Sequence, residues 1–460
     1  MTQIIYPTLD LFRYQLRNGL GDSDKQIEAN HRSFWINLPD DIKVNLEKES
    51  LAENPEYVKL LELFDAYTKK NLNIQENTYY FYNDNNSNLE GYYYPVRLYD
   101  SYCLIFNSSI NDKQNKQPIT SFKILVKQAA KKKGNLGKSW MASGYLSTTN
   151  EPNSEKLAKD IYLELFNHEC QNLLQGKFLG ATLFEVWKAP QKWQNIDSEN
   201  IHILIIIYPN LSIMEVAAGF YGDWLRLFSS RNKILWEYTY SQELIKELQH
   251  EFKSIIDSTK QVKNLYPNNK DKEFNRQQLN ELQKILIDSI ATLSEYAIKI
   301  SYLEILKSAI NINLQAYQKY LKDIEIKAQE KQEKQDKNNQ IYDTDLKCLE
   351  NFTELVKQKY TIQVEQDYTN LSLGLRIGED LINTIRGIIE IEQTKRDRTL
   401  NTTVAVAGIG LATSQMASAV ILATPNDYQQ HLRFRLEVFG WSILIGATAA
   451  LITYAFFRRK

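Results

Sequence analysis

The chain has 460 residues, with 55 basic against 56 acidic side chains. A balance this close to neutral gives no general attraction to polyanions, so no nucleic-acid partner is expected. The length suggests roughly three domains. The cysteines, Cys103, Cys170 and Cys348, are widely spaced and odd in number, which argues against a disulfide framework and for reduced thiols in the cytoplasm.

Residues 1–210 mix strand and helix patterns, and we predict a cytosolic α/β domain there. The N-terminal stretch has no basic head followed by an apolar run, so no secretory signal is expected. Aromatic and β-branched runs at 76–83 and 91–109 predict two strands joined by a loop. Residues 121–128 and 201–209 predict further strands, and the second is apolar on both faces, which favours a central place in a sheet.

Residues 211–340 predict a cytosolic helical region made of antiparallel long helices. Apolar residues recur there at alternating steps of three and four, the heptad spacing of helices that pack along their length. A charged stretch at 327–340 interrupts the pattern and is typical of a solvated helix end or turn. The stripe comprises Leu279, Leu282, Leu286, Ser289, Leu293, Tyr296, Ile300, Leu303, Lys307, Ile310, Leu314 and Tyr317.

Residues 341–403 predict a stalk helix with a second heptad stripe. No proline lies between Thr344 and Thr424, so one helix could continue through this whole region. Both stripes are compatible with helices packing inside one chain and with helices packing between subunits. The second stripe comprises Val364, Tyr368, Leu371, Leu375, Gly378, Ile382, Ile385 and Ile389.

The C-terminal part contains two uncharged runs, 404–424 and 438–457, each close to the about 20 residues that a helix needs to cross the hydrocarbon of a bilayer. We predict two transmembrane helices there, joined by an outer loop at 425–437 and followed by a basic cytosolic tail at 458–460. Basic residues precede the first span and follow the second. This distribution places both termini in the cytoplasm of a multi-pass protein of the plasma (inner) membrane. A dinucleotide-binding reading of Gly408-x-Gly410 lacks the second strand and the acidic residue that such a fold needs.

Small residues at every fourth position of both spans favour close helix packing and therefore a homo-oligomer in the lipid bilayer. A small and polar stripe on the first span is explained first by an interhelical hydrogen bond from the mid-span amide, and its functional interpretation is a pore face. Two polar residues beyond the span predict a cation-concentrating outer mouth, or simply a turn. The candidate pore-lining residues are Asn401, Gly408, Ala412 and Gln415, and the mouth residues are Asn426 and Asp427.

A basic loop at 131–138 is the candidate cytosolic site for an anionic ligand, with Lys131, Lys132, Lys133 and Lys138 as its cations. Its Gly137-Lys138-Ser139 resembles the end of a phosphate-binding loop, but the spacing requires a glycine where Lys132 stands. The five histidines are scattered, and no catalytic or metal-binding spacing emerges. We therefore expect no enzyme activity, no catalytic residues and no cofactor, and the sequence leaves any metal site unknown.

An α+β cytosolic domain followed by a long α-helical stalk and a C-terminal two-helix transmembrane hairpin resembles the CorA-like magnesium transporter family. In that family five subunits surround a pore lined by the first span, which implies a pentamer with magnesium as the transported or regulatory divalent cation. The family's Gly-Met-Asn signature is absent, and Thr424-Pro425-Asn426-Asp427 stands in its place. Divergent members are associated with bacterial defence as effectors opened by a nucleotide-type messenger, which implies a small anionic messenger as a partner here.

Three functional hypotheses follow from these patterns. The first is an oligomeric cation channel or transporter gated through its cytosolic domain. The second is a ligand-gated effector that depolarises or permeabilises the membrane. The third is a non-conducting membrane tether that anchors a helical interaction platform, which the heptad stripes support as well as they support a channel.

Overall fold

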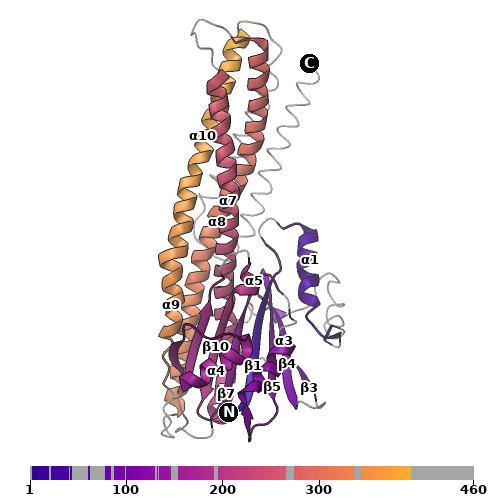
Figure 1. Ribbon diagram of the computed structural model, residues 1–460, viewed down its shortest axis with the longest axis vertical. Helices are drawn as coiled ribbons and strands as arrows, with labels where there is room; N and C mark the ends of the chain where they lie inside the picture. The colour runs from indigo at the N-terminus through magenta and orange to yellow at the C-terminus, as the bar shows by residue number, and fades with distance from the viewer. Residues whose placement is uncertain are drawn as a thin grey trace. The chain divides into compact units, whose positions relative to one another are not determined.

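A computed structural model of the chain (Figure 1) describes residues 3–19, 22–40, 42–43, 61–62, 78–83, 88–98, 100–129, 132, 134–146, 154–190, 195–265, 274–335 and 343–394. The chain divides into two compact units. Unit 1 comprises Met1–Tyr240 and Ser308–Ile362, and unit 2 comprises Ser241–Lys307 and Gln363–Lys460. The domain boundaries predicted at residues 210, 340 and 403 separate consecutive segments of the chain, whereas each compact unit combines two separate segments. The predicted boundaries stay predictions.

The described strands of unit 1 form one ten-stranded sheet in the order β2-β4-β5-β1-β7-β10-β9-β8, with β3 paired to β4 and β6 paired to β1. Neighbours are antiparallel except for β7 with β10 and β2 with β4. The strands are β1 (Gln3–Leu16), β2 (Leu61–Glu62), β3 (Tyr79–Asn83), β4 (Leu89–Leu98), β5 (Ser101–Ile110), β6 (Lys116–Pro118), β7 (Gly137–Tyr145), β8 (Leu174–Phe178), β9 (Ala181–Lys188) and β10 (Ile201–Tyr208).

The two faces of this sheet are separated by the alternation of side chains along each strand. Leu9 and Leu11 of β1 belong to an apolar core that also contains residues of α3 (Phe122–Ala129) and α4 (Ser154–Phe166). Asp10, Phe12 and Tyr14 point to the opposite face, where α7 (Tyr221–Leu265) packs, because Phe12 contacts the ring of Phe228 and the Tyr14 hydroxyl donates to the Leu225 carbonyl.

Shorter helices complete unit 1. α1 (Asp24–Trp35) brings Phe34 against Tyr102 and Leu104 of β5 in a second apolar cluster. The 3-10 turn η3 (Ile119–Ser121) precedes α3, and α5 (Ile196–Glu199) precedes β10. α6 (Leu211–Ala218) begins directly after β10, because the side chain of Asn210 accepts a hydrogen bond from the Ile213 amide and caps the first turn.

The long helices are α7, α8 (Arg276–Gln335) and α10 (Ile362–Thr394), and α10 follows α9 (Lys347–Leu355) through the π-helical turn η6 (Val356–Thr361). In unit 2, segments of α7, α8 and α10 lie side by side (Figure 1). A Cβ at Gly374 would lie 2.5 Å from the Tyr296 hydroxyl, and one at Gly378 would lie 2.5 Å from Leu293 Cδ1. These glycines therefore let α10 approach α8 closely.

The heptad stripes predicted from the sequence occupy buried positions. In the first, every member except Leu279 and Lys307 is buried. In the second, Val364, Leu371, Ile382, Ile385 and Ile389 are among the buried residues. Helix packing thus buries these apolar side chains, while charged residues remain on the other sides of the same helices.

The predicted fold class requires a correction. Unit 1 is an α+β domain and long helices are present, but no helix within the described residues is long and apolar enough to cross a membrane. The physical reason is that the long helices are amphipathic, with their apolar residues confined to packing stripes. The CorA-like architecture, the multi-pass inner-membrane localisation and the expected membrane ion transport or channel are therefore not supported. The predicted spans at 404–424 and 438–457 lie outside the described residues.

Individual elements also test the sequence reading. The strand predicted at 201–209 is confirmed as β10, which pairs with β7 on one side and β9 on the other. The strand predicted at 121–128 is wrong, since these residues form helix α3. Their apolar run is short, and Phe122, Leu125 and Ala129 recur at steps of three and four that place them on one buried helix face.

Candidate ligand cavity

A cavity of about 610 Å³ opens at one end of the sheet face that α7 covers. Its floor consists of hydroxyl and amide side chains from three neighbouring strands, namely Thr8, Asn107, Ser109 and Ser143. One wall is α6, through Leu211, Met214, Glu215 and Ala218. The volume lies within the range that small-molecule sites usually occupy. The remaining lining residues are Tyr6, Thr78, Tyr80, Glu90, Gly91, Tyr92, Lys113, Tyr208, Gly219 and Tyr221.

Asp10 lies at the back of this cavity and is fully buried. Its carboxylate accepts hydrogen bonds from the Tyr221 hydroxyl at 2.6 Å and from Asn107 Nδ2 at 2.7 Å, and both donors line the cavity. Burial raises the pKa of Asp10 to about 7, although the two hydrogen bonds oppose this rise. Asp10 therefore exchanges its proton near neutral pH, behind a polar wall that a ligand can reach.

Tyr6 lies at the edge of the cavity in an unusual backbone conformation, with φ at 50°. This region is rarely adopted by a residue with a large side chain, and it coincides with an irregularity in the β1–β7 pairing between Ile5 and Thr8. The conformation directs the Tyr6 hydroxyl to Glu90 Oε1, 2.6 Å away. The Lys113 ammonium lies over the Tyr6 ring, 5.2 Å from its centroid.

Three tyrosines from three elements form a continuous aromatic wall. The rings of Tyr80 in β3 and Tyr92 in β4 meet edge to face with centroids 6.0 Å apart, and Tyr92 meets Tyr221 of α7 in the same manner at 6.5 Å. Burial, together with the charge of Asp10, raises the pKa of Tyr92 and Tyr221 well above the ordinary tyrosine value. Both hydroxyls therefore stay protonated and act as hydrogen-bond donors at physiological pH.

Gly91 allows close packing in this part of the sheet. A Cβ at this position would lie 2.1 Å from the carbonyl oxygen of Asn107 and 2.6 Å from the Phe81 ring. No side chain fits without moving the paired strand β5, so a glycine is required where β4 passes the cavity. A Cβ on Gly91 would point toward Phe81 and the apolar core on the other face of the sheet, whereas its neighbours Glu90 and Tyr92 line the cavity.

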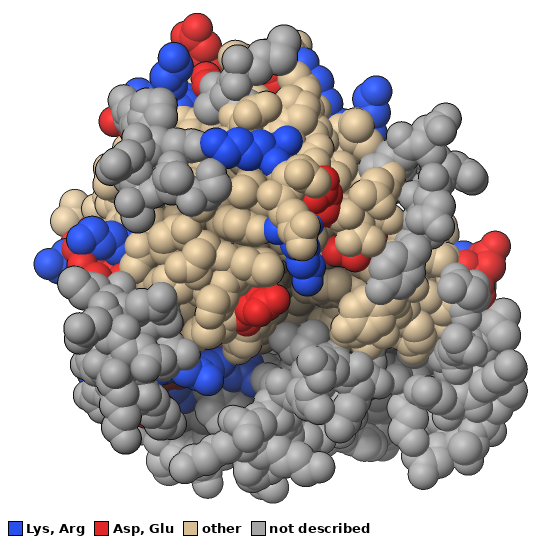
Figure 2. Space-filling model, turned by 90° about the horizontal axis from the view of Figure 1, so that it is seen from below, with Lys and Arg blue, Asp and Glu red and all other residues tan. Residues whose placement is uncertain are grey.

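Figure 2 shows one face of the molecule, on which Lys and Arg are interspersed with Asp and Glu over a largely uncharged described surface. The described charge in this view is therefore mixed in sign.

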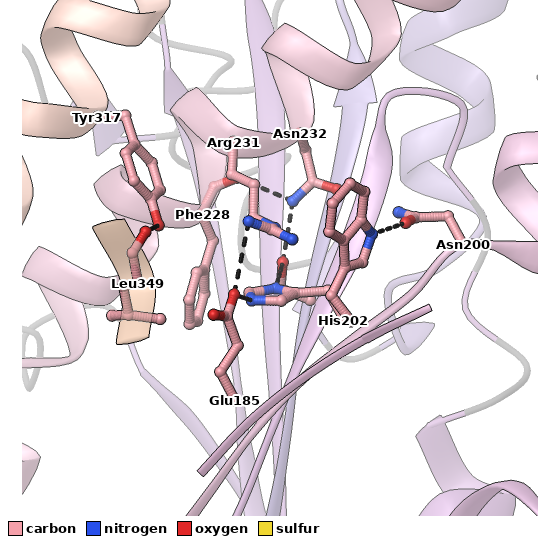
Figure 3. Close-up of polar contacts among 10 residues, drawn as sticks. Glu185, Asn200, His202, Phe228, Arg231, Asn232, Tyr317 and Leu349 are labelled. Carbon is pink, nitrogen blue, oxygen red and sulfur yellow. Dashed lines mark hydrogen bonds and ion pairs between the residues drawn. The ribbon is translucent and has the colours of Figure 1, made fainter. Parts of the chain in front are cut away.

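A second group of polar residues occupies the opposite end of the same sheet face (Figure 3). Glu185 of β9 and His202 of β10 lie close to Arg231 of α7. Ser139 of β7 hydrogen-bonds to His202 and to Asn232 of α7, and all five residues are buried. Glu185 Oε1 lies 3.3 Å from His202 Nε2 and 3.6 Å from Arg231 Nη1. The Arg231 guanidinium also lies 4.8 Å from the Trp187 ring centroid and 3.9 Å from that of Phe352.

The hydrogen bonds fix the protonation pattern of this group. Asn232 Nδ2 donates to Ser139 Oγ at 3.0 Å, so the Ser139 hydroxyl is free to donate to His202 Nδ1, 2.9 Å away. The imidazole proton then resides on Nε2, facing Glu185. Burial, followed by the nearby charge of Arg231, lowers the pKa of His202 to about 4, and Glu185 only partly offsets this. The imidazole is neutral at physiological pH.

Ser139, His202 and Glu185 have the composition of a hydrolytic triad, but their position argues against catalysis. Ser139 has no exposed surface and His202 only 1%. A nucleophile must reach its substrate, and this hydroxyl is enclosed between the sheet and α7. Within this group the charges of Glu185 and Arg231 instead compensate each other. Their side chains connect β9, β10 and α7 with the α9 residue Phe352 within unit 1.

A neighbouring pocket of about 510 Å³ has Glu185, Trp187 and Phe352 in its lining together with Cys170. Its carboxylate is already engaged by His202 and Arg231. Burial raises the pKa of the Cys170 thiol, so the reactive thiolate is disfavoured. Within the described residues, no cluster of three or more His, Cys, Asp or Glu side chains is arranged to hold a metal.

The residues predicted as an anion site are placed elsewhere. The Lys132 ammonium donates to the Asn37 carbonyl at 2.7 Å and lies 4.6 Å from the Tyr93 ring centroid. Lys138 belongs to β7, opposite Arg13 of β1. Lys131 and Lys133 lie outside the described residues, as do all the pore and mouth candidates, Asn401, Gly408, Ala412, Gln415, Asn426 and Asp427.

Sequence reasoning missed the cavity because its residues extend from Tyr6 to Tyr221. One signal was present: Asp10 is a single carboxylate within the run Thr8-Leu-Asp-Leu-Phe12, at a position that alternation assigns to a buried face. A buried charge is costly, so such a residue marks a site that needs partners. The tyrosine-rich runs were interpreted only as strands.

Comparisons of the chain with protein-family models, with curated proteins and with solved structures found no match. The resemblance to the CorA-like family therefore stays a prediction. So does the expectation that the chain is not an enzyme.

Proposed function

We propose that unit 1 is a small-molecule sensor, with the cavity beside Asp10 as its binding site and α7 as its output. The supporting observation is the position of Tyr221, which lines the cavity, donates to the buried Asp10 and is also the first residue of α7. A ligand that changes the hydrogen bond of Tyr221 acts directly on that helix. Residues 221–240 of α7 belong to unit 1 and residues 241–265 belong to unit 2.

Binding can be tested with the full chain in a thermal-unfolding screen of small molecules. Ala218 is an exposed residue of α6 that lines the cavity, so Ala218→Trp fills the cavity without disturbing the core. Ser212 is exposed on the same helix but does not line the cavity, which makes Ser212→Trp the matched control. True ligands raise the Tm of wild type and Ser212→Trp but not of Ala218→Trp. A screen without any such compound rejects the proposed binding function.

Output through α7 needs a separate measurement. Hydrogen exchange of residues 241–265 should slow when a ligand from the screen is bound, because ordering of Tyr221 stabilises the helix that it begins. Tyr221→Phe keeps the aromatic ring but loses the hydrogen bond to Asp10. We expect this variant to bind the ligand while its exchange in 241–265 stays at the unliganded rate. An unchanged exchange response in Tyr221→Phe would show that the signal does not pass through this bond.

A further inference from the structure

We propose that the ligand of this cavity is a compact organic cation bearing an ammonium group. This inference rests on the sensor function proposed above and specifies the chemistry of the same site. It follows from the aromatic wall, from the excess of carboxylates over cations around the cavity, and from the hydrogen bonds that already tie three of the lining donors to these carboxylates.

The aromatic wall provides the first argument. Tyr6, Tyr80, Tyr92, Tyr208 and Tyr221 all line the cavity. The negative electrostatic potential on the face of a phenol ring attracts cations within about 6 Å, and ammonium ligands are recognised by such groups of rings. The same chemistry is already visible here, since the Lys113 ammonium lies 5.2 Å from the centre of the Tyr6 ring.

The charge balance provides the second argument. Glu90 and Glu215 line the cavity, and Asp10 lies behind it, whereas Lys113 is the one basic residue in the described lining. Glu90 is half-buried and is held in place by the Tyr6 hydroxyl at 2.6 Å. In a site partly shielded from water, such carboxylates favour a cation and disfavour an anion.

Hydrogen-bonding capacity points in the same direction. The Tyr221 hydroxyl and Asn107 Nδ2 already donate to Asp10, and the Tyr6 hydroxyl already donates to Glu90. The hydroxyls of Thr8 and Ser109 bond to each other at 2.9 Å. An anion that used the donors beside Asp10 and Glu90 would have to break these bonds to the two carboxylates, whereas a cation leaves them intact.

Isothermal titration of the full chain with choline and with 3,3-dimethylbutan-1-ol tests this proposal, because the two probes have nearly the same shape and differ by the positive charge. Tetramethylammonium and ethylammonium extend the cation series, and inorganic phosphate serves as the anion. We expect the cations to bind at least ten times more tightly than the neutral alcohol. Glu90→Gln and Tyr92→Leu should each weaken choline binding at least tenfold, while Ser212→Trp should not change it.

Each other outcome has a distinct meaning. Equal binding of choline and the neutral alcohol overturns the proposal, because shape rather than charge is then recognised. Failure of all three cations to bind up to millimolar concentration also overturns it. If the thermal screen nevertheless yields neutral or anionic ligands that Ala218→Trp abolishes, the sensor function stands and only the cationic class is wrong. If no compound of any class binds, both proposals fail.

Discussion

The two polar groups on the α7 face of the sheet solve the problem of buried charge in different ways. At one end, Glu185 is accompanied by Arg231 and by a neutral His202, and aromatic rings enclose the guanidinium. At the other end, Asp10 has two neutral donors and a cavity beside it, and its described hydrogen-bond partners include no group of opposite charge. The buried charge of Glu185 is therefore compensated within the core. The charge of Asp10 can be neutralised only by a proton or by a ligand.

Removing the buried cation should have the largest effect. Arg231→Met keeps much of the side-chain volume but leaves Glu185 buried without its ion-pair partner, which we expect to cost about 3–5 kcal/mol in the free energy of unfolding. Urea-induced unfolding measures this. Adding Glu185→Gln to the same variant should recover at least half of the loss, because the uncompensated charge is then gone. A loss below about 1 kcal/mol for Arg231→Met would show that the pair contributes little.

The Asp10 end should respond to pH in the opposite direction from an ordinary carboxylate. Its folded pKa of about 7 exceeds the ordinary value of 3.8, so the folded state binds the proton more tightly and loses stability as pH rises from about 4 to 7. Asp10→Asn removes this loss. The stability of the variant relative to wild type should therefore increase by on the order of 4 kcal/mol between pH 4 and pH 8. A constant difference across that range contradicts the raised pKa.

The His202 end should show the reverse pH dependence. The folded pKa of about 4 lies below the ordinary value of 6.5, so the unfolded state binds the proton more tightly between these values. The contribution of neutral His202 to the free energy of unfolding is fully present above pH 6.5 and is lost as the pH decreases toward 4. His202→Gln should lose this dependence, so the advantage of wild type over the variant should shrink by about 3 kcal/mol from pH 7 to pH 4. Unfolding measured at both pH values decides the matter.

The smallest expected effect concerns the bond that joins the cavity to α7. Tyr221→Phe removes the donor to Asp10 but keeps the ring contacts, and we expect a loss of about 1 kcal/mol at pH 8, where the carboxylate is ionised. At pH 5 the loss should be smaller, since Asp10 is then largely protonated. Tyr14→Phe serves as a comparison, because its hydroxyl donates to the neutral carbonyl of Leu225 and should show no such pH dependence.

The local patterns of the chain predicted much of its secondary structure. The heptad stripes of α8 and α10 and the strand β10 are readable because helix and strand periods determine which side chains share a face. The same reasoning failed at 121–128, where a segment of eight residues with only four apolar side chains is too short to separate a strand from a buried helix. It also led to a membrane architecture that the described helices do not support.

The sequence by itself therefore determined local periods and one isolated clue, the carboxylate of Asp10 within an apolar strand. Only the tertiary structure decided what surrounds it. Strand pairing places Asn107 opposite Asp10, and α7 brings Tyr221 to the same carboxylate from more than 200 positions away. The same packing encloses Ser139, His202 and Glu185 and so closes a constellation whose residue types alone suggest catalysis. Burial and access are properties of the packed chain, and for that reason no local pattern reveals them.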